Sequence, residues 1–230
     1  KLLIEKGADL DLRDESGRSP LIWAIFRGKT VIAELLIEKR ANLNLTDENG
    51  WSALIWAIYK NKTDTENLII EKGADLNITD KNGWSALIWA IYTGKRDTVR
   101  LLIEKGAELN IRGKNGWTTL IWTVYKGETD TAKLLIEKRV DVNVKDDLQG
   151  RSALLWAISE SKTDMANLLI EKGADVNVSD KNGWSALIWA AYKGDTDTAK
   201  SLVEKGADLN VRDNLQGRPA LMWAISENKT

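Results

Sequence analysis

The sequence predicts an all-α solenoid built from repeated pairs of short helices. Near copies of the segment 183–194 recur along the 230 residues, and the glycine that opens each copy returns at intervals of 33 or 34 residues. A period in this range is typical of solenoids, in which each repeat packs only against its neighbours. The opening glycines are Gly17, Gly50, Gly83, Gly116, Gly150, Gly183 and Gly217.

The second complete repeat illustrates the unit. Leu54 to Ile58 form an apolar helical face that ends at Asn61, and Leu68 to Ile70 form another that ends at Gly73. Asn61 and Gly73 follow the two helices, where the chain needs residues that tolerate left-handed geometry. The next stretch, 74–83, is rich in turn-forming residues, which predicts a β-hairpin-like finger before the next helix.

This unit resembles the ankyrin repeat, whose pattern is a turn, a glycine, Thr-Pro-Leu-His-x-Ala, a second helix with a leucine pair, and then Gly-Ala-Asp-x-Asn. The resemblance extends over the whole chain, and the Gly-Ala-Asp signature begins at Gly7, Gly73, Gly173 and Gly206. Most copies have Ser-Ala-Leu-Ile in place of Thr-Pro-Leu-His, so the hydrogen bonds of the family's histidine are absent. We expect apolar packing to replace them, by Ile22, Ile55, Ile88, Ile121, Leu155, Ile188 and Met222.

The repeat pattern predicts one continuous array over residues 1–230. A partial repeat stands at each end, and both ends are expected to expose apolar surface, because no polar capping repeat is recognisable. Two interpretations follow: the chain is cut from a longer array, or its copies stack end to end. The predicted units are a partial repeat at 1–13, full repeats at 14–46, 47–79, 80–112, 113–145, 146–179 and 180–212, and a partial repeat at 213–230.

Composition argues against catalysis. The chain has neither cysteine nor histidine, which removes thiol nucleophiles, the commonest zinc ligands and the usual proton shuttle at neutral pH. Phosphate-cradling loops, nucleophile elbows and metal-ligand spacings are also not found. We therefore expect no enzyme activity, no cofactor and no metal site.

Charge and hydropathy limit the partners. The 33 basic and 34 acidic residues nearly cancel, which makes nucleic acid an unlikely partner. No apolar run approaches the roughly 18 residues that a membrane-spanning helix needs, so no membrane insertion is expected. The absence of cysteine favours an intracellular compartment, and the localisation stays open.

One tryptophan recurs in the first helix of every repeat. Each ring could contribute roughly 4–6 kcal/mol from burial before entropy is subtracted. We expect these rings to pack in the core or between repeats and not to form a ligand site. They are Trp23, Trp56, Trp89, Trp122, Trp156, Trp189 and Trp223.

A second aromatic set supplies the candidate binding site. Trp51, Trp84, Trp117 and Trp184 directly follow the turn glycine, and Tyr59, Tyr92, Tyr125 and Tyr192 close the first helices. In ankyrin-like proteins these positions line the concave groove, where partners bind, and Tyr and Trp are the residue types that dominate binding hot spots. The alternative is that the rings stack between repeats and only stiffen the array. The row is longest over 47–145, because Arg18, Arg151 and Arg218 replace the tryptophan elsewhere.

Basic residues stand beside this row. Lys81 and Lys114 lie on the predicted turns and complete the candidate binding set, and they would suit an acidic partner surface. Glu48, Asp80 and Glu128 are interspersed with them and are expected to be solvated charges.

The resemblance implies a non-catalytic scaffold that binds a protein or a peptide through its concave groove. The alternative is a structural protein whose partner is a second copy of itself, joined through the uncapped ends into an extended array or filament.

Overall fold

The computed structural model describes residues 2–227, which contain fourteen helices. Lys1 and residues 228–230, which belong to the predicted terminal partial repeats, lie outside the described residues. The chain divides into two compact units, residues 1–113 (unit 1) and 114–230 (unit 2), and each is described by itself. The division into the repeats 14–46 to 180–212, and their continuity as one array, stay predictions.

Each unit is a stack of helix pairs. Unit 1 contains α1 (Leu2–Glu5), α2 (Pro20–Phe26), α3 (Thr30–Glu38), α4 (Ala53–Tyr59), α5 (Thr63–Glu71), α6 (Ala86–Tyr92) and α7 (Arg96–Glu104). Unit 2 contains α8 (Thr119–Lys126), α9 (Thr129–Glu137), α10 (Ala153–Ser159), α11 (Thr163–Glu171), α12 (Ala186–Lys193), α13 (Thr196–Glu204) and α14 (Ala220–Ser226).

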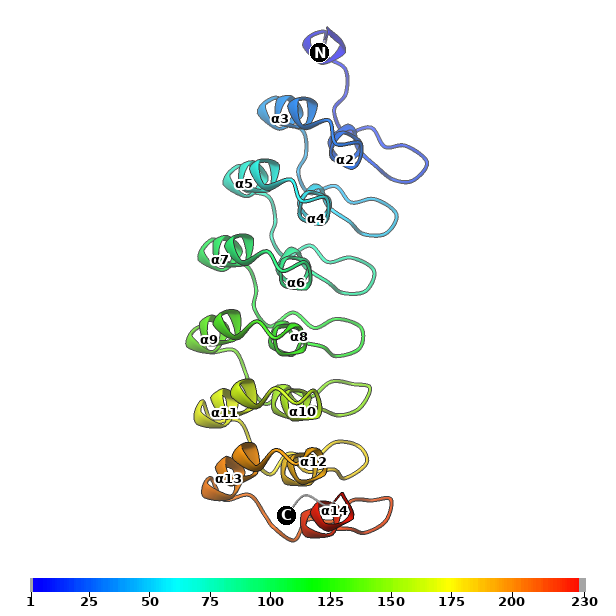
Figure 1. The fold of residues 1–230 in the computed structure, drawn as a ribbon. Helices are drawn as coiled ribbons and strands as arrows, with labels where there is room; N and C mark the ends of the chain where they lie inside the picture. Colours follow the sequence, from blue (N-terminus) through cyan, green and yellow to red (C-terminus); the bar gives the residue numbers. More distant parts are fainter. Residues whose placement is uncertain (1, 228–230) are drawn as a thin grey trace. The chain divides into compact units, whose positions relative to one another are not determined.

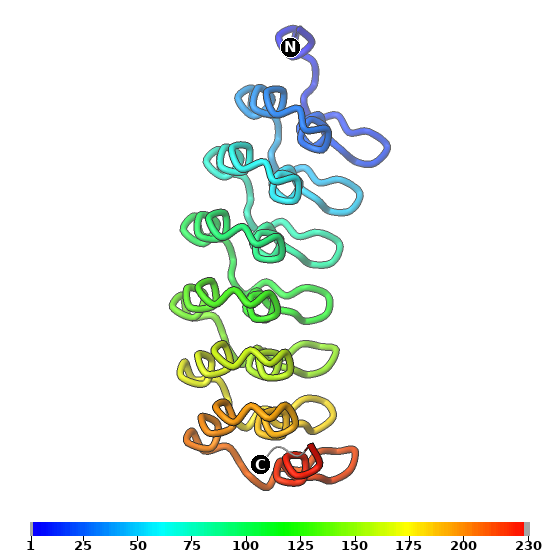
Figure 2. The backbone as a smooth tube through the Cα atoms, viewed as in Figure 1, coloured from blue at the N-terminus to red at the C-terminus, as the bar shows by residue number. Residues whose placement is uncertain are grey.

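The helices of each unit form two layers (Figure 1). In unit 1 the first helices α2, α4 and α6 pack on one another, and each also packs on the second helix that follows it. In unit 2 the first helices α8, α10, α12 and α14 pack on one another in order, and α8, α10 and α12 also pack on the second helices that follow them. We call these the first-helix layer and the others the second-helix layer. The backbone trace shows that the fingers extend from the first-helix layer, away from the second helices (Figure 2).

Local residue choices fix where the helices begin and end. The Ser52 hydroxyl oxygen accepts from the Ile55 N–H at 3.3 Å and caps α4, and α5 carries Asp64 in its first turn, where a negative charge is favourable. Asn61 and Gly73 have φ values of 57° and 81°, so both predicted left-handed positions are confirmed. Ser161 also has a positive φ, 56°, which the sequence did not predict.

The core is mainly apolar, and this includes the positions where the ankyrin pattern has histidine. Ile22, Ile55, Ile88, Ile121, Leu155 and Ile188 are all 0 % exposed, so the expected apolar replacement of the histidine is confirmed for these six. Met222 of α14 differs, because 53 % of it is exposed.

The fingers are hairpin-like and bonded to one another. An isolated antiparallel bridge joins Thr46 to Ser52 at the base of one finger. Between fingers, the Lys81 N–H donates to the Asn49 carbonyl at 3.0 Å. Gly50 lies at this contact with φ of +79°, and a Cβ there would approach the Asp80 Cα to 3.0 Å, so the position requires glycine. None of the described helices combines the length and apolar character that a bilayer span demands.

Candidate functional site

A buried carboxylate joins each of several fingers to the first helix that follows. Asp47 Oδ1 accepts from the backbone N–H groups of Asn49 and Trp51, both at 2.9 Å. Its Oδ2 accepts from Trp56 Nε1 at 2.9 Å. The carboxylate therefore fixes both the turn and the orientation of the indole ring, and its charge is stabilised by donors in place of water.

The same arrangement recurs in both units. Asp80 accepts from Trp89 Nε1 at 3.1 Å, and it is 5 % exposed. The expectation that Asp80 is a solvated charge is therefore wrong, because its carboxylate turns inward to meet N–H donors. The signal in the sequence is the aspartate three or four residues before the turn glycine, which stands at Asp14, Asp47, Asp80, Asp146, Asp180 and Asp213 and gives way to Gly113 in one repeat. All of these aspartates except Asp14 are buried.

Asp213 shows the electrostatic consequence. Burial raises the pKa of its carboxyl, but N–H donors from Gln216, Trp223, Leu215 and Arg218 outweigh this effect and hold the pKa below its ordinary value. The carboxylate therefore stays ionised at neutral pH.

Tryptophans of the two aromatic sets alternate in unit 1 in a continuous stack of tilted and edge-on ring contacts. The ring of Trp51 lies 4.6 Å, between centroids, from Trp56 of its own repeat and 4.6 Å from Trp89 of the next. Trp84 continues the stack at 4.9 Å from Trp89. Trp56 and Trp89 are 8 % exposed, which confirms the packing expected of them, whereas Trp23 is 37 % exposed.

The tyrosines differ from these tryptophans in exposure. Tyr59 meets Trp51 edge-on at 5.0 Å and Tyr92 meets Trp84 at 5.2 Å, yet the two tyrosines are 50 % and 40 % exposed. The half-buried tryptophans thus support tyrosine rings that face solvent. The tryptophans contact rings of neighbouring repeats, as the alternative interpretation expects, whereas Tyr59 and Tyr92 are exposed; binding through this set stays a prediction.

Unit 2 repeats this geometry around Trp117. Its ring lies 4.5 Å from Trp122 and 4.8 Å from Trp156, and it supports Tyr125 at 5.2 Å. Tyr125 is 43 % exposed.

The stack around Trp184 is built in the same way. Trp184 lies 4.6 Å from Trp189 and 4.7 Å from Trp223 and supports Tyr192, which is only partly exposed, at 5.2 Å.

Arginine continues the stack where tryptophan is missing. The guanidinium of Arg151 lies 5.2 Å from the ring centroid of Trp156 and 4.5 Å from that of Trp189, one repeat further. Arg218 likewise lies 5.3 Å from Trp223. The aromatic row ends at these positions, as expected, but the stacking does not, because a planar guanidinium packs on aromatic faces.

Lys162 secures the end of α8 beneath Tyr125. Its ammonium donates to the carbonyls of Val124, at 2.8 Å, and Tyr125, and lies 5.8 Å from the Tyr125 ring. Burial lowers the pKa of Lys162; Lys126 lowers it further, and Glu160 partly offsets both effects.

The two predicted lysines lie on the fingers, Lys81 in unit 1 and Lys114 in unit 2, and both are exposed.

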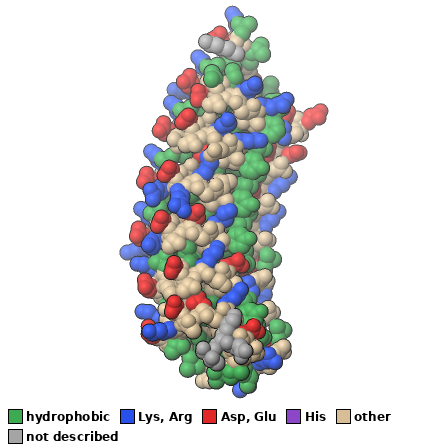
Figure 3. Space-filling model, viewed as in Figure 1, with side chains coloured by type: hydrophobic (Ala, Val, Ile, Leu, Met, Phe, Trp, Pro, Cys, Tyr) green, Lys and Arg blue, Asp and Glu red, His purple; other side chains and the backbone are tan. Residues whose placement is uncertain are grey.

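On the face shown in Figure 3, hydrophobic side chains gather along the first-helix layer of each unit, and charged side chains are spread over the second-helix layer. Within residues 2–227, no three Asp or Glu side chains are grouped so that they could hold a metal ion.

Comparison with known proteins gives one consistent result. A family model described as ankyrin repeats (3 copies) matches residues 1–80, 32–113, 61–146, 110–180 and 154–230. The chain is also similar to the solved ankyrin repeat domain of Bcl-3, a member of the IkappaB protein family, with 27 % identity over 91 % of this chain and 95 % of that one, and a TM-score of 0.77. The human ASB11 ankyrin repeat domain is similar at 26 % identity over 90 % and 92 % of the chains, with a TM-score of 0.72. A search of curated proteins gives no match.

Proposed function

Because the chain belongs to the ankyrin-repeat family, we propose that it is a non-catalytic scaffold that binds a protein or a peptide through the concave groove formed by its first helices and fingers. Ankyrin-repeat domains generally act as protein–protein interaction modules, and domains of this fold similar to this chain are non-catalytic.

The observation that carries the proposal is the exposure of tyrosines on a rigid support. Tyr59 and Tyr92 are 50 % and 40 % exposed, while their supporting rings are half-buried, Trp51 against Trp56 and Trp89, and Trp84 against Trp89. A tyrosine loses little conformational freedom on binding and offers a large amphipathic surface, which suits a hot spot. Because the surface is preformed, little ordering cost opposes association.

The predicted site residues divide into three roles. The tryptophans position the tyrosines, the tyrosines contact the partner, and Lys81 and Lys114 act at the rim. The positioning residues are Trp51, Trp84, Trp117 and Trp184, and the contact residues are Tyr59, Tyr92, Tyr125 and Tyr192.

The double replacement Tyr59→Ala and Tyr92→Ala tests the proposal. A partner is isolated with the wild-type chain, and its affinity for purified variants is measured by calorimetry. We expect the affinity to fall at least about tenfold, which corresponds to ~1.4 kcal/mol, because the double variant removes two exposed rings from the interface.

Two controls accompany this measurement. Tyr59→Phe with Tyr92→Phe keeps the rings and should retain most of the affinity. Val31→Ala changes a side chain of the second-helix layer that is 76 % exposed and should have no effect. An unchanged affinity of the double alanine variant, with its fold intact, rejects the proposed surface.

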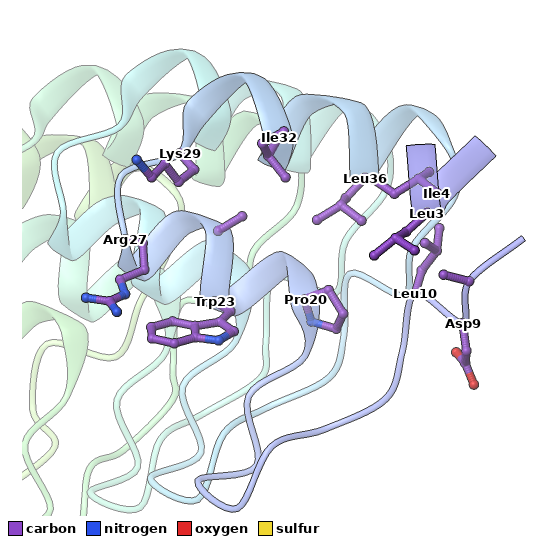
Figure 4. Close-up of a pocket in the computed structure, with 12 residues that line it drawn as sticks. Leu3, Ile4, Asp9, Leu10, Pro20, Trp23, Arg27, Lys29, Ile32 and Leu36 are labelled. Atoms are coloured by element: carbon purple, nitrogen blue, oxygen red, sulfur yellow. The ribbon is translucent and has the colours of Figure 1, made fainter. Parts of the chain in front are cut away.

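End-to-end assembly is the second candidate, favoured by two apolar surfaces. In α14, Leu221, Met222 and Ile225 are 68 %, 53 % and 59 % exposed, although the equivalent residues of α4 are buried. In unit 1, a groove of about 780 Å³ lies beside α1, α2 and α3 (Figure 4). Its apolar border is formed by Leu3, Ile4, Pro20, Trp23, Ile32 and Leu36.

The groove lies where a further first helix would fit. In unit 1 each of α4 and α6 packs against the first helix before it and against its own second helix. A second copy that placed α14 between α1 and α2 would reproduce these contacts, and such a head-to-tail contact does not close on itself.

Light scattering over a concentration series tests this assembly. We expect the mass of the wild type to grow with concentration and Ile32→Asp, which places a charge in the groove, to remain a monomer. Val31→Asp is the matched control, because it adds the same charge to the neighbouring residue of α3 outside the groove lining. A wild-type protein that remains a monomer at every concentration contradicts end-to-end assembly.

A further inference from the structure

Three cations of unit 1 gather on two aromatic rings of α2. The Arg18 guanidinium lies 4.4 Å from the ring centroid of Phe26 and 5.8 Å from that of Trp23. The Arg27 guanidinium lies 4.5 Å from the Trp23 ring centroid (Figure 4), and the Lys60 ammonium lies 5.1 Å from that of Phe26. The two rings contact each other, with their centroids 5.5 Å apart. We call Arg18, Arg27 and Lys60 the cation cluster.

The rings hold these three positive charges close together. Phe26 is shared by Arg18 and Lys60, and Trp23 is shared by Arg18 and Arg27. The negative faces of the rings attract each cation, which offsets part of the repulsion between the like charges. A ring has no net charge, however, so these contacts leave the positive charge of the cation cluster uncompensated.

The cation cluster has no carboxylate partner within residues 2–227, because none of its members forms an ion pair with Asp or Glu there. The equivalent of Arg18 in unit 2 differs, since Arg151 Nε lies 3.5 Å from Asp180 Oδ2. Arg18 Nε is buried and makes no hydrogen bond within the described residues. A buried donor of this kind is uncommon in folded proteins and indicates that an acceptor from outside the chain fits there.

The acidic residues of the two adjoining fingers do not compensate the cation cluster. Asp14 Oδ1 accepts from the Arg18 backbone N–H at 2.8 Å. The buried Asp47 carboxylate accepts from N–H groups of its own finger and of the following first helix. Glu15 and Glu48 are exposed on these fingers and form no ion pair within the part of the chain that the structure describes.

The cation cluster adjoins the exposed tyrosines and is open to solvent. Lys60 directly follows Tyr59, and its ammonium lies 5.8 Å from the centroid of the Tyr59 ring. Arg27 is exposed, and so is Trp23, at 37 %. A partner that covers Tyr59 therefore also reaches the cation cluster.

We infer that the cation cluster binds an acidic segment of the protein or peptide partner through the carboxylates of Asp or Glu side chains. The inference rests on the proposed function, because it names the chemistry of the partner beside Tyr59. Carboxylates supply negative charge for all three cations, and a guanidinium binds them with two parallel hydrogen bonds. The net charge of the whole chain is -1, so a short acidic segment suits this local cluster better than a polynucleotide, which requires a broad basic surface.

The experiment is a titration followed by NMR of the Trp23 indole N–H signal, which is assigned through Trp23→Phe. The probe is a hexaglutamate peptide with blocked ends, hexaglutamine is the neutral control, and the ionic strength is constant. We expect the Trp23 signal to shift saturably with hexaglutamate and not with hexaglutamine, because Arg18 and Arg27 lie on that ring. A single-stranded oligothymidylate of equal charge tests the competing class of ligand.

The test variant is Arg27→Gln with Lys60→Gln. It removes two of the three charges, and we expect the affinity for hexaglutamate to fall at least about fivefold. Arg18→Trp removes the third charge, inserts the tryptophan that other repeats have at this position, and is expected to weaken binding as well. The matched control is Arg100→Gln with Lys105→Gln, which removes two exposed charges from the second-helix layer of unit 1 and should leave the affinity unchanged. Circular dichroism verifies the fold of each variant.

A Trp23 signal that hexaglutamate does not shift overturns the inference, as does a control variant that loses as much affinity as the test variant. Tighter binding of oligothymidylate than of hexaglutamate, lost in the test variant, also overturns it and assigns the cation cluster to nucleic acid.

These outcomes are distinguishable from a failure of the proposed function. If Tyr59→Ala with Tyr92→Ala weakens the partner while hexaglutamate does not bind, the tyrosines bind a partner that has no acidic segment at the cation cluster. If hexaglutamate binds and the tyrosine variant keeps its affinity for the partner, the proposed tyrosine surface is wrong and the carboxylate site stands.

Discussion

Replacement of Asp80 by alanine is expected to lower the free energy of unfolding by about 3–5 kcal/mol, because several buried donors lose one charged acceptor together. Asp80 accepts from the N–H groups of Asn82 at 2.8 Å and Trp84 at 2.9 Å, and from the Trp89 indole at 3.1 Å. The side chain is only 5 % exposed, so water cannot replace it without local opening. Chemical denaturation followed by circular dichroism measures the loss.

Asp80→Asn is the matched control. It preserves the shape of the side chain and one acceptor oxygen, which can serve the N–H groups of Asn82 and Trp84, whereas its NH2 group faces the Trp89 N–H and cannot accept from it. We therefore expect a smaller loss than that of the alanine variant. A second consequence is local: without the carboxylate, Trp84 and Trp89 lose their fixed orientation, and Tyr92, which rests on Trp84, loses its support. An alanine variant as stable as the wild type would show that the carboxylate does not hold the finger to the helix.

Glu66→Met is expected to cost a similar amount, about 3–5 kcal/mol, because it leaves a buried cation without its partner. The Glu66 carboxylate, which is 0 % exposed, accepts from Lys95 Nζ at 2.5 Å and from Thr98 Oγ1 at 2.8 Å. The Lys95 side chain is itself only 12 % exposed. The pair joins α5 to the start of α7 within unit 1.

The double variant Glu66→Met with Lys95→Met separates the two contributions. An apolar pair of similar volume removes the desolvation cost of both charges, so we expect the double variant to recover most of the stability lost by Glu66→Met alone. Denaturation of the wild type, both single variants and the double variant completes the cycle. Additive losses would show that Glu66 and Lys95 do not act as a pair.

The features that the sequence predicted correctly are local or periodic. The left-handed residues Asn61 and Gly73 follow from their positions in the repeat. Arg40 and Arg139 occupy the position of Gly73 in other repeats and also adopt positive φ values, 65° and 62°, although arginine is costly in that conformation. The apolar residue in place of the family's histidine follows from its position within the repeat, and every repeat contributes evidence for it.

The contacts that the sequence missed depend on how neighbouring repeats meet. In the sequence, Asp80 cannot be distinguished from an ordinary charged turn residue. Only the fold brings its carboxylate to the indole N–H of Trp89. Glu66 was not expected to be buried, although Val99 occupies the equivalent position of the next second helix, and this apolar register is the signal that could have found it. The sequence also could not predict that Tyr59 is more exposed than Trp51, because the ring that covers Trp51 is Trp89 of the following repeat.

The measurement that tests the central claim most directly is amide hydrogen exchange of the chain with and without its bound partner, read by mass spectrometry. The account predicts slower exchange on binding in the fingers and at the ends of α4 and α6, around Tyr59 and Tyr92, with unchanged exchange in α3, α5 and α7. Protection confined to the second-helix layer, with the fingers and first helices unaffected, would contradict a binding surface built on the aromatic stack.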